Sequence, residues 1–181
     1  MSRPYLLTLS TIEPRKNLPF LVDLFERLTD FDGDLVICGH PGWKYEPVLE
    51  RIRTSKRAAS IKLLGHMGDG DLPALYSGAS LFLCSSFYEG FGFPPLEAMA
   101  CGTPVLSSAG GSLAEVLGDA AVVRRDFELD GWLADVRRLL SDDSLRAEHR
   151  RRGLLQAAQY RWEKTARETW AVYREVAAGG V

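Results

Sequence analysis

Short apolar runs alternate with longer amphipathic stretches, and this alternation constrains the fold more than any other feature of the sequence. Tyr5–Leu9 and Asp34–Cys38 are two such runs, each of a length and composition typical of strands buried on both faces. Between them, the segment that Asn17 opens repeats its apolar residues at helical spacing, and we expect Asn17 to cap that helix. Strands that alternate with helices predict a parallel sheet covered on both sides.

The same pattern extends along the chain and predicts six strands and eight helices. The expected strands are Tyr5–Leu9, Asp34–Cys38, Ile61–Leu64, Ser80–Cys84, Pro104–Leu106 and Ala120–Val123. The expected helices start at Asn17 and after Pro94-Pro95, or span Tyr45–Ala58, Asp71–Ser77, Leu113–Leu117, Leu129–Leu140, Ser144–Ala158 and Trp162–Val176. We therefore predict an α/β protein with one Rossmann-like, doubly wound, six-stranded parallel sheet over residues 1–181, in which ligands bind at the carboxyl ends of the strands.

Composition excludes several classes of function. The 22 Lys and Arg residues against 24 Asp and Glu residues give a formal charge of −2, which argues against a nucleic-acid partner. The three cysteines and three histidines show neither disulfide nor metal-ligand spacing, so no metal site is expected. No apolar run is long enough for a membrane helix and the first residues lack a signal-peptide core. We therefore expect a cytoplasmic protein.

The loop after the first strand carries two adjacent cations, Arg15 and Lys16, just before a helix begins. A helix N-terminus offers free N–H groups and a partial positive charge, and the two side chains add full charges. The loop is therefore a candidate diphosphate site. An exposed Arg-Lys pair without a ligand is equally compatible with this segment alone.

The loop after the fourth strand has the composition of a ligand loop. Gly90 and Gly92 allow the backbone to approach a ligand closely, and Pro94-Pro95 favour the start of a helix. Glu89 precedes this helix and Glu97 is expected in its first turn. Carboxylates accept hydrogen bonds from sugar hydroxyls and loop amides donate them to phosphate, so this loop is a candidate binding site for a ligand with such groups.

Other loops at the same predicted edge carry weaker signals. Gly39-His40 follows the second strand and Gly65-His66 follows the third. A base or ribose has room to rest at Gly39, Gly65 and His66, although His40 is more typical of a surface turn. The Gly110-Gly111 pair after the fifth strand is a further source of backbone N–H groups.

At Glu89–Glu97 the sequence resembles a known family. EGFGFPPLE is similar to the Glu–seven residues–Glu signature of retaining nucleotide-sugar glycosyltransferases of family four, which have the GT-B fold. PRKN, GHMGDGDLPALYSGAS, PLEAMACGTPVL, EVLGDAA and the RWEKTARETWAVYREV tail resemble the C-terminal lobe of that family. GHPGWKYEPVLE is most similar to members that add mannose or related sugars to bacterial polysaccharides.

The resemblance implies a role for each matching residue. Arg15 and Lys16 would neutralise the donor diphosphate, Glu89 would contact donor-sugar hydroxyls and Glu97 would bind the ribose hydroxyls. The backbone of Phe91, Gly92 and Phe93 would approach the sugar and phosphate. The family implies transfer with retention of configuration, without a metal or other cofactor.

The resemblance also implies partners. The substrates would be a nucleoside-diphosphate sugar, with GDP-mannose favoured, and a saccharide or lipid-linked acceptor. We expect the chain to be a C-terminal fragment without the N-terminal acceptor lobe, which binds donor and is inactive alone, whereas the intact enzyme is compatible with peripheral membrane association. The stripe around Trp170 and Tyr173 on the last helix is then expected to be exposed.

Three alternatives remain open. The chain is also compatible with a non-catalytic nucleotide-sugar-binding module and with the lobe of a sugar-nucleotide epimerase. Two carboxylates also suggest a retaining glycosidase, which needs them about 5–5.5 Å apart. Within the favoured interpretation, Glu97→Ala should weaken nucleotide binding and Glu89→Ala should spare free nucleotide.

Overall fold

Six parallel strands form one sheet in the computed structural model, which describes residues 3–179. The strands are β1 (Tyr5–Leu9), β2 (Asp34–Cys38), β3 (Ile61–Leu64), β4 (Leu81–Cys84), β5 (Val105–Ser108) and β6 (Val122–Arg124). They lie in the order β3-β2-β1-β4-β5-β6, and every neighbouring pair is parallel. The predicted α/β fold with a six-stranded parallel sheet is confirmed. Residues 1–2 and 180–181 of the predicted 1–181 domain lie outside the described residues.

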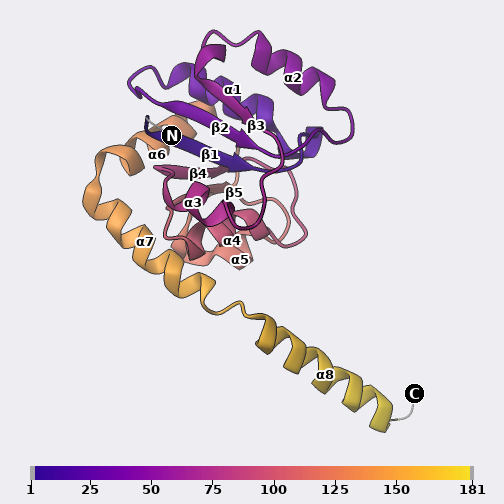
Figure 1. Cartoon of the computed structure of the whole chain (residues 1–181). Helices are drawn as coiled ribbons and strands as arrows, with labels where there is room; N and C mark the ends of the chain where they lie inside the picture. The colour runs from indigo at the N-terminus through magenta and orange to yellow at the C-terminus, as the bar shows by residue number, and fades with distance from the viewer. Residues whose placement is uncertain (1–2, 180–181) are drawn as a thin grey trace.

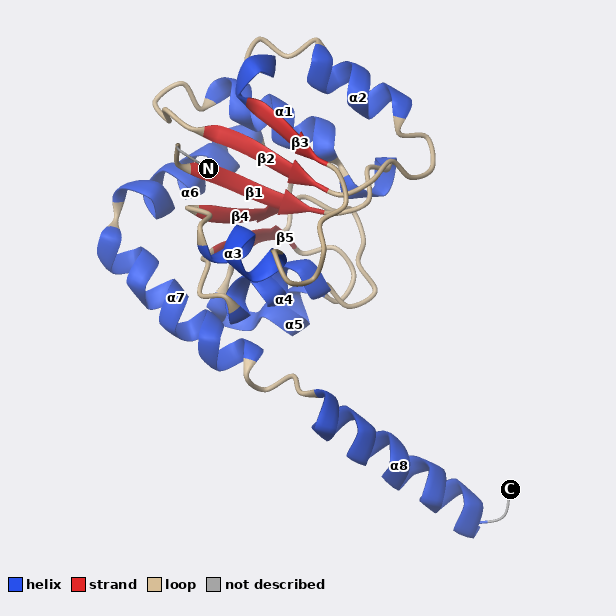
Figure 2. Cartoon of the chain, in the orientation of Figure 1, coloured by secondary structure: helices blue, strands red, loops and turns tan. Residues whose placement is uncertain are grey.

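Helices cover both faces of the sheet, as Figures 1 and 2 show. They are α1 (Leu18–Arg27), α2 (Glu46–Arg53), α3 (Leu72–Ser77), α4 (Phe93–Ala100), α5 (Leu113–Leu117), α6 (Leu129–Ser141), α7 (Asp143–Ala157) and α8 (Trp162–Gly179). The apolar faces of α1, α2 and α6 pack on one side of the strands, and those of α3, α4 and α5 pack on the other. α7 lies along α4, and Gly153 is its buried contact with Met99.

The central strands are apolar because both of their faces are covered. Leu6 belongs to the core on the α1 side and Leu7 to the core on the α3 side, as alternating side chains of a doubly covered strand must. Trp132 of α6 is completely buried and donates its indole N–H to the carbonyl of Asp126 at 2.8 Å. These two cores fix the carboxyl ends of β1, β4 and β5 side by side.

The last helix, α8, projects away from the body of the domain (Figure 1). None of its residues is buried, and Trp170 and Tyr173 are 62% and 63% exposed. The prediction that this apolar stripe is exposed is therefore confirmed. Only the beginning of α8 approaches the domain, where the ring of Trp162 stacks 6.2 Å from that of Phe93.

Two local predictions differ from the structure. Asn17 stands before α1 in a left-handed conformation (φ 51°), and its side chain makes no capping hydrogen bond. The helix expected over Tyr45–Ala58 ends at Arg53, and a separate 3₁₀ turn spans Ala58–Ser60. Thr54 follows the last residue of this helix, and both its amide and its hydroxyl donate to the Glu50 carbonyl, at 2.9 and 2.8 Å.

Candidate functional site

The candidate site lies where the sheet reverses its direction of winding. β2 and β3 lie to one side of β1, whereas β4, β5 and β6 lie to the other. Ligands of open α/β sheets bind at this switch point, outside the carboxyl ends of the strands. Arg15 and Lys16 follow β1, and Glu89 follows the adjacent strand β4. Topology therefore brings together residues that are more than seventy positions apart in the sequence.

The segment with the two cations is bound tightly to the β4 loop. Pro14–Lys16 forms a 3₁₀ turn immediately before α1. The buried hydroxyl of Ser85 donates to the carbonyls of Lys16 and Asn17 at 2.9 and 3.1 Å, and the Phe87 amide donates to the Arg15 carbonyl at 2.9 Å. These backbone contacts fix where both cationic side chains begin.

Glu89 binds both cations. Its Oε1 accepts a hydrogen bond from Lys16 Nζ at 2.6 Å, and its Oε2 accepts one from Arg15 Nη1 at 3.1 Å. Ser86 donates its hydroxyl to the same Oε1 at 2.6 Å. The side chains of Lys16 and Glu89 are only 11% and 13% exposed, so the ion pair is partly shielded from water. Arg15 also pairs with Glu13 at 2.7 Å.

This environment keeps Glu89 ionised. Burial raises the pKa of Glu89, but the hydrogen bonds from Lys16 and Ser86 and the charge of Lys16 outweigh burial, so the pKa lies below its ordinary value. A carboxylate that stays ionised accepts hydrogen bonds and does not donate them. Glu89 is therefore suited to accept hydrogen bonds from sugar hydroxyls.

The backbone of the Glu89 loop is held by the loop after β5. Ser112 donates its amide and its hydroxyl to the Glu89 carbonyl at 3.1 and 3.2 Å, and the Glu89 amide donates to Gly110 at 3.3 Å. Gly111 has φ +67°, and a Cβ there would lie 2.2 Å from the Glu89 carbonyl oxygen. Only glycine fits this position without displacing the Glu89 loop.

The helix α4 begins shortly after Glu89, at Phe93. Gly92 stands before the helix with φ +95°. Pro94 and Pro95 carry no N–H, so Phe93 contributes the backbone amide at the start of this helix. Phe91 and Phe93 pack together with ring centroids 4.7 Å apart, and the Phe93 side chain is half exposed. Gly90 has no positive φ and open space at its Cβ position, so the backbone conformation does not require glycine there.

Glu97 lies one turn deeper than predicted. α4 begins at Phe93, so Glu97 is its fifth residue and belongs to the second turn. Its Oε2 accepts a hydrogen bond of 2.7 Å from the phenol of Tyr76 on α3. Glu89 and Glu97 thus have separate sets of partners, and only Glu89 is paired with cations.

The two loops after β2 and β3 also meet. The Gly39 amide donates to the Gly65 carbonyl at 3.0 Å, and the rings of His40 and His66 lie 6.5 Å apart. Gly39, Gly65 and His66 therefore share the carboxyl edge of the sheet with Glu89, on the β2–β3 side of the switch point. Their proposed contact with a base or ribose stays a prediction.

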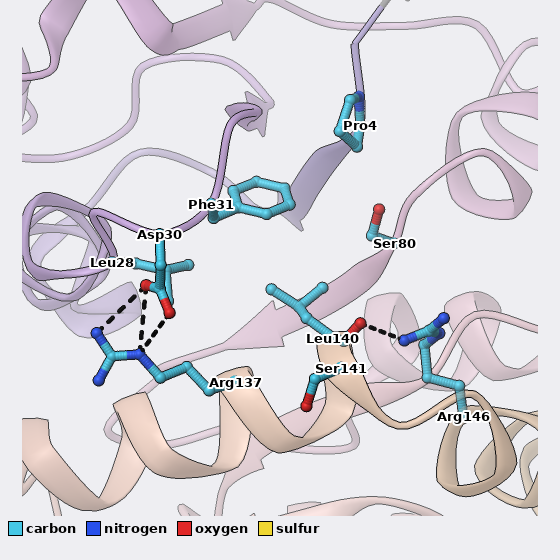
Figure 3. A pocket seen from close by; sticks show the side chains of 9 residues that line it. All are labelled: Pro4, Leu28, Asp30, Phe31, Ser80, Arg137, Leu140, Ser141 and Arg146. Carbon is cyan, nitrogen blue, oxygen red and sulfur yellow. Dashed lines mark hydrogen bonds and ion pairs between the residues drawn. The ribbon is translucent and has the colours of Figure 1, made fainter.

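One surface cavity lies away from this edge of the sheet. Figure 3 shows a cavity of about 560 Å³ lined by Pro4, Leu28, Asp30, Phe31, Ser80, Arg137, Leu140, Ser141 and Arg146. Pro4 and Ser80 directly precede β1 and β4, so the cavity is at the amino ends of the strands. Arg137 pairs with Asp30 at 3.0 Å, and Arg146 binds the last carbonyls of α6. The charged groups of this cavity satisfy one another, so it does not compete with the candidate site.

Three residues of the site were missed by the sequence analysis. Ser86 donates to Glu89, Tyr76 donates to Glu97, and Ser112 holds the Glu89 loop. Nothing in their spacing marks them, because the contacts depend on how β4, α3 and the β5 loop pack. The Gly110-Gly111 pair was the one signal for the third contact.

The strand order and the switch-point site define a Rossmann-like α/β domain. The chain belongs to the glycosyl transferases group 1 family, whose model matches residues 1–156. It is 40% identical over 173 residues to O-antigen chain mannosyltransferase B of Escherichia coli, covering 94% of this chain and 45% of that protein. It is 34% identical over 177 residues to the serotype-specific mannosyltransferase WbdA of Escherichia coli, covering 90% of this chain and 20% of that protein. The chain thus spans less than half the length of these relatives.

Solved structures share the fold. Sucrose-phosphate synthase from Thermosynechococcus elongatus superposes with a TM-score of 0.88 at 23% identity, over 99% of this chain and 47% of that one. Anabaena HepE, solved in complex with UDP and glucose, superposes with a TM-score of 0.84 at 20% identity, over 96% of this chain and 48% of that one. The fold is that of GT-B glycosyltransferases, as predicted. Among residues 3–179, no helix combines the length and apolar character needed to cross a membrane.

Proposed function

We propose that this chain is the donor-binding lobe of a retaining glycosyltransferase that transfers a hexose from a nucleoside-diphosphate sugar. One observation carries the proposal: Arg15 and Lys16 both bind Glu89 at the switch point, at 3.1 and 2.6 Å. A diphosphate gains negative charge as the glycosidic bond breaks. Fixed cations and the N-terminus of α4 stabilise that charge without reorganising, which lowers the barrier.

Each residue would then have a distinct task. Arg15 and Lys16 bind the diphosphate, and the amides around Gly92 approach the phosphate and sugar. Glu89, ionised and pre-positioned by Ser86, accepts hydrogen bonds from the sugar hydroxyls. Glu97, exposed on the second turn of α4, accepts hydrogen bonds from the ribose. The two cations would take the place that a metal has in other phosphate-transfer sites.

The donor and acceptor are proposed from the relatives. Two of them are named mannosyltransferases, one of the O-antigen chain. We infer GDP-mannose as the donor, and a saccharide or lipid-linked acceptor in cytoplasmic polysaccharide synthesis. A second lobe would hold the acceptor, and the exposed stripe with Trp170 and Tyr173 on α8 supports a contact with it. The chain alone would then bind donor without transferring its sugar.

Calorimetric titration tests the proposal. GDP, UDP, dTDP and ADP are titrated into the chain in the presence of a chelator, followed by the matching nucleotide sugars. Saturable binding of one nucleotide is expected, and Lys16→Ala should weaken it at least about tenfold because a charge-assisted hydrogen bond is lost. Lys164→Ala on α8 removes the same charge away from the site and should leave the affinity unchanged. Binding that is absent for all four nucleotides, or equal in both variants, would contradict a donor site at Lys16.

A further inference from the structure

The carboxylate of Glu97 is exposed on α4, but its hydrogen-bond partner is buried. Tyr76 of α3 is 2% exposed and donates its phenol to Glu97 Oε2 at 2.7 Å. A buried phenol needs a hydrogen-bond partner, and Glu97 supplies one from the surface of α4. The same bond also holds the Glu97 carboxylate in one place.

The phenol is fixed from several directions. Its ring packs against Phe82 of β4 with centroids 5.8 Å apart, and the Tyr76 carbonyl accepts a hydrogen bond of 2.6 Å from the buried Thr103 hydroxyl. Burial raises the pKa of Tyr76 and the neighbouring Glu97 carboxylate raises it further. Tyr76 thus keeps its phenol proton and stays a donor at neutral pH.

The two carboxylate oxygens of Glu97 differ in their hydrogen bonds. Oε2 is held by Tyr76, whereas Oε1 accepts no hydrogen bond from residues 3–179. A free glutamate on a helix surface samples several rotamers, and a ligand that needs one of them must restrict the rest. The bond to Tyr76 restricts the carboxylate before any ligand arrives.

We propose that Tyr76 is a positioning residue, which acts through Glu97 to present one carboxylate oxygen to the ribose hydroxyls of the nucleotide. The inference rests on the proposed function, because it takes Glu97 as the ribose contact. Tyr76 itself touches no substrate. Its effect must therefore vanish whenever Glu97 or the ribose hydroxyls are removed.

The test is a cycle of variants and ligands. Tyr76→Phe, Glu97→Ala and the double variant are titrated with the nucleoside diphosphate that the wild-type chain binds and with its 2′,3′-dideoxy analogue. Tyr76→Phe should weaken the ordinary nucleotide roughly three- to tenfold, the range of one hydrogen bond. It should have no effect on the dideoxy analogue and no added effect in the Glu97→Ala background.

Tyr5→Phe is the matched control. Tyr5 is also buried, and its phenol donates a hydrogen bond of 2.7 Å to the Leu75 carbonyl on α3, the helix that carries Tyr76. Its loss removes an equivalent core hydrogen bond without touching Glu97, so nucleotide affinity should stay at the wild-type value. A second variant, Glu97→Asp, changes only an exposed position and withdraws the carboxylate from Tyr76. Glu97→Asp should lose as much nucleotide affinity as Tyr76→Phe, and it tests the proposal even if Tyr76→Phe disturbs folding.

The outcomes separate the two proposals. If Glu97→Ala weakens binding but Tyr76→Phe weakens both nucleotides equally, or Glu97→Asp binds like wild type, the positioning role is wrong and the donor site stands. If no nucleotide binds the wild-type chain, the proposed function fails and the positioning role falls with it.

Discussion

Removing the charge of Glu89 should tighten the binding of free nucleoside diphosphate. The sequence alone suggested that Glu89 is irrelevant to a nucleotide without sugar. The structure changes this expectation, since Glu89 binds Lys16 at 2.6 Å and Arg15 at 3.1 Å. A diphosphate must share or replace those contacts. In Glu89→Gln both cations are released from that carboxylate.

The size of the effect follows from the geometry. A phosphate oxygen in contact with Lys16 Nζ would lie about 5 Å from the Glu89 carboxylate oxygen, because two contacts of about 3 Å diverge from one tetrahedral nitrogen. Two unit charges at that separation repel by about 3 kcal/mol at an effective dielectric constant of about 20. Water at the open side of the site screens part of this, which leaves about 1–2 kcal/mol, or roughly five- to thirtyfold in affinity.

Calorimetry of Glu89→Gln with nucleoside diphosphate and with the matching nucleotide sugar measures the effect. The nucleotide sugar should gain less than the free nucleotide, since hydrogen bonds from its hydroxyls to the carboxylate are weakened at the same time. Glu175→Gln on α8 changes the net charge equally and should bind like wild type. A Glu89→Gln variant that binds free nucleotide more weakly than wild type would refute the reasoning.

Three further predictions concern the frame of the site. Gly111→Ala should weaken donor binding by at least about fivefold, because its Cβ would displace the Glu89 carbonyl; wild-type affinity in a titration would contradict this. Between pH 7 and 3, the free energy of unfolding should fall by about 1 kcal/mol less in Glu26→Gln than in the wild type, as measured by urea unfolding. The Arg51 hydrogen bond lowers the pKa of Glu26 from 4.5 to about 2, so its stabilisation is present above pH 4.5 and is lost as the pH falls towards 2. Deleting residues 163–181 should leave the thermal melting temperature unchanged, since none of the described residues of α8 is buried, and a clear decrease would show that α8 stabilises the domain.

Most of the fold followed from periodicity. Each strand of the sheet is a short apolar run, so its position could be predicted within one or two residues. The helix ends were harder to predict, because no glycine or proline directly follows the last residue of α2, Arg53. Asn17 illustrates the difficulty: a residue type that commonly caps helices instead adopts a left-handed turn without a capping bond.

The charged residues of the site could be predicted from the sequence, but the hydrogen bonds and ion pairs between them could not. Arg15, Lys16 and Glu89 stood out because charged residues and glycines gather in loops after apolar strands. That Glu89 binds both cations could not be predicted from the sequence, since the contact depends on β1 and β4 being neighbours. Ser86 and Tyr76 were missed for the same reason: they carry no pattern of their own and act through the residue that they touch.

The charged side chains of the site balance one another, and this balance bears on which ligand the site would select. Two cations, Arg15 and Lys16, face two carboxylates, Glu13 and Glu89. A diphosphate cannot bind there by net attraction and must take cations away from Glu89. Free nucleotide would leave that carboxylate with fewer partners in a partly buried place, which is costly. A nucleotide sugar brings hydroxyls that replace the lost hydrogen bonds. The Glu89 carboxylate would therefore favour binding of the nucleotide sugar over binding of the nucleoside diphosphate. It would also help to release the nucleoside diphosphate after the sugar is transferred.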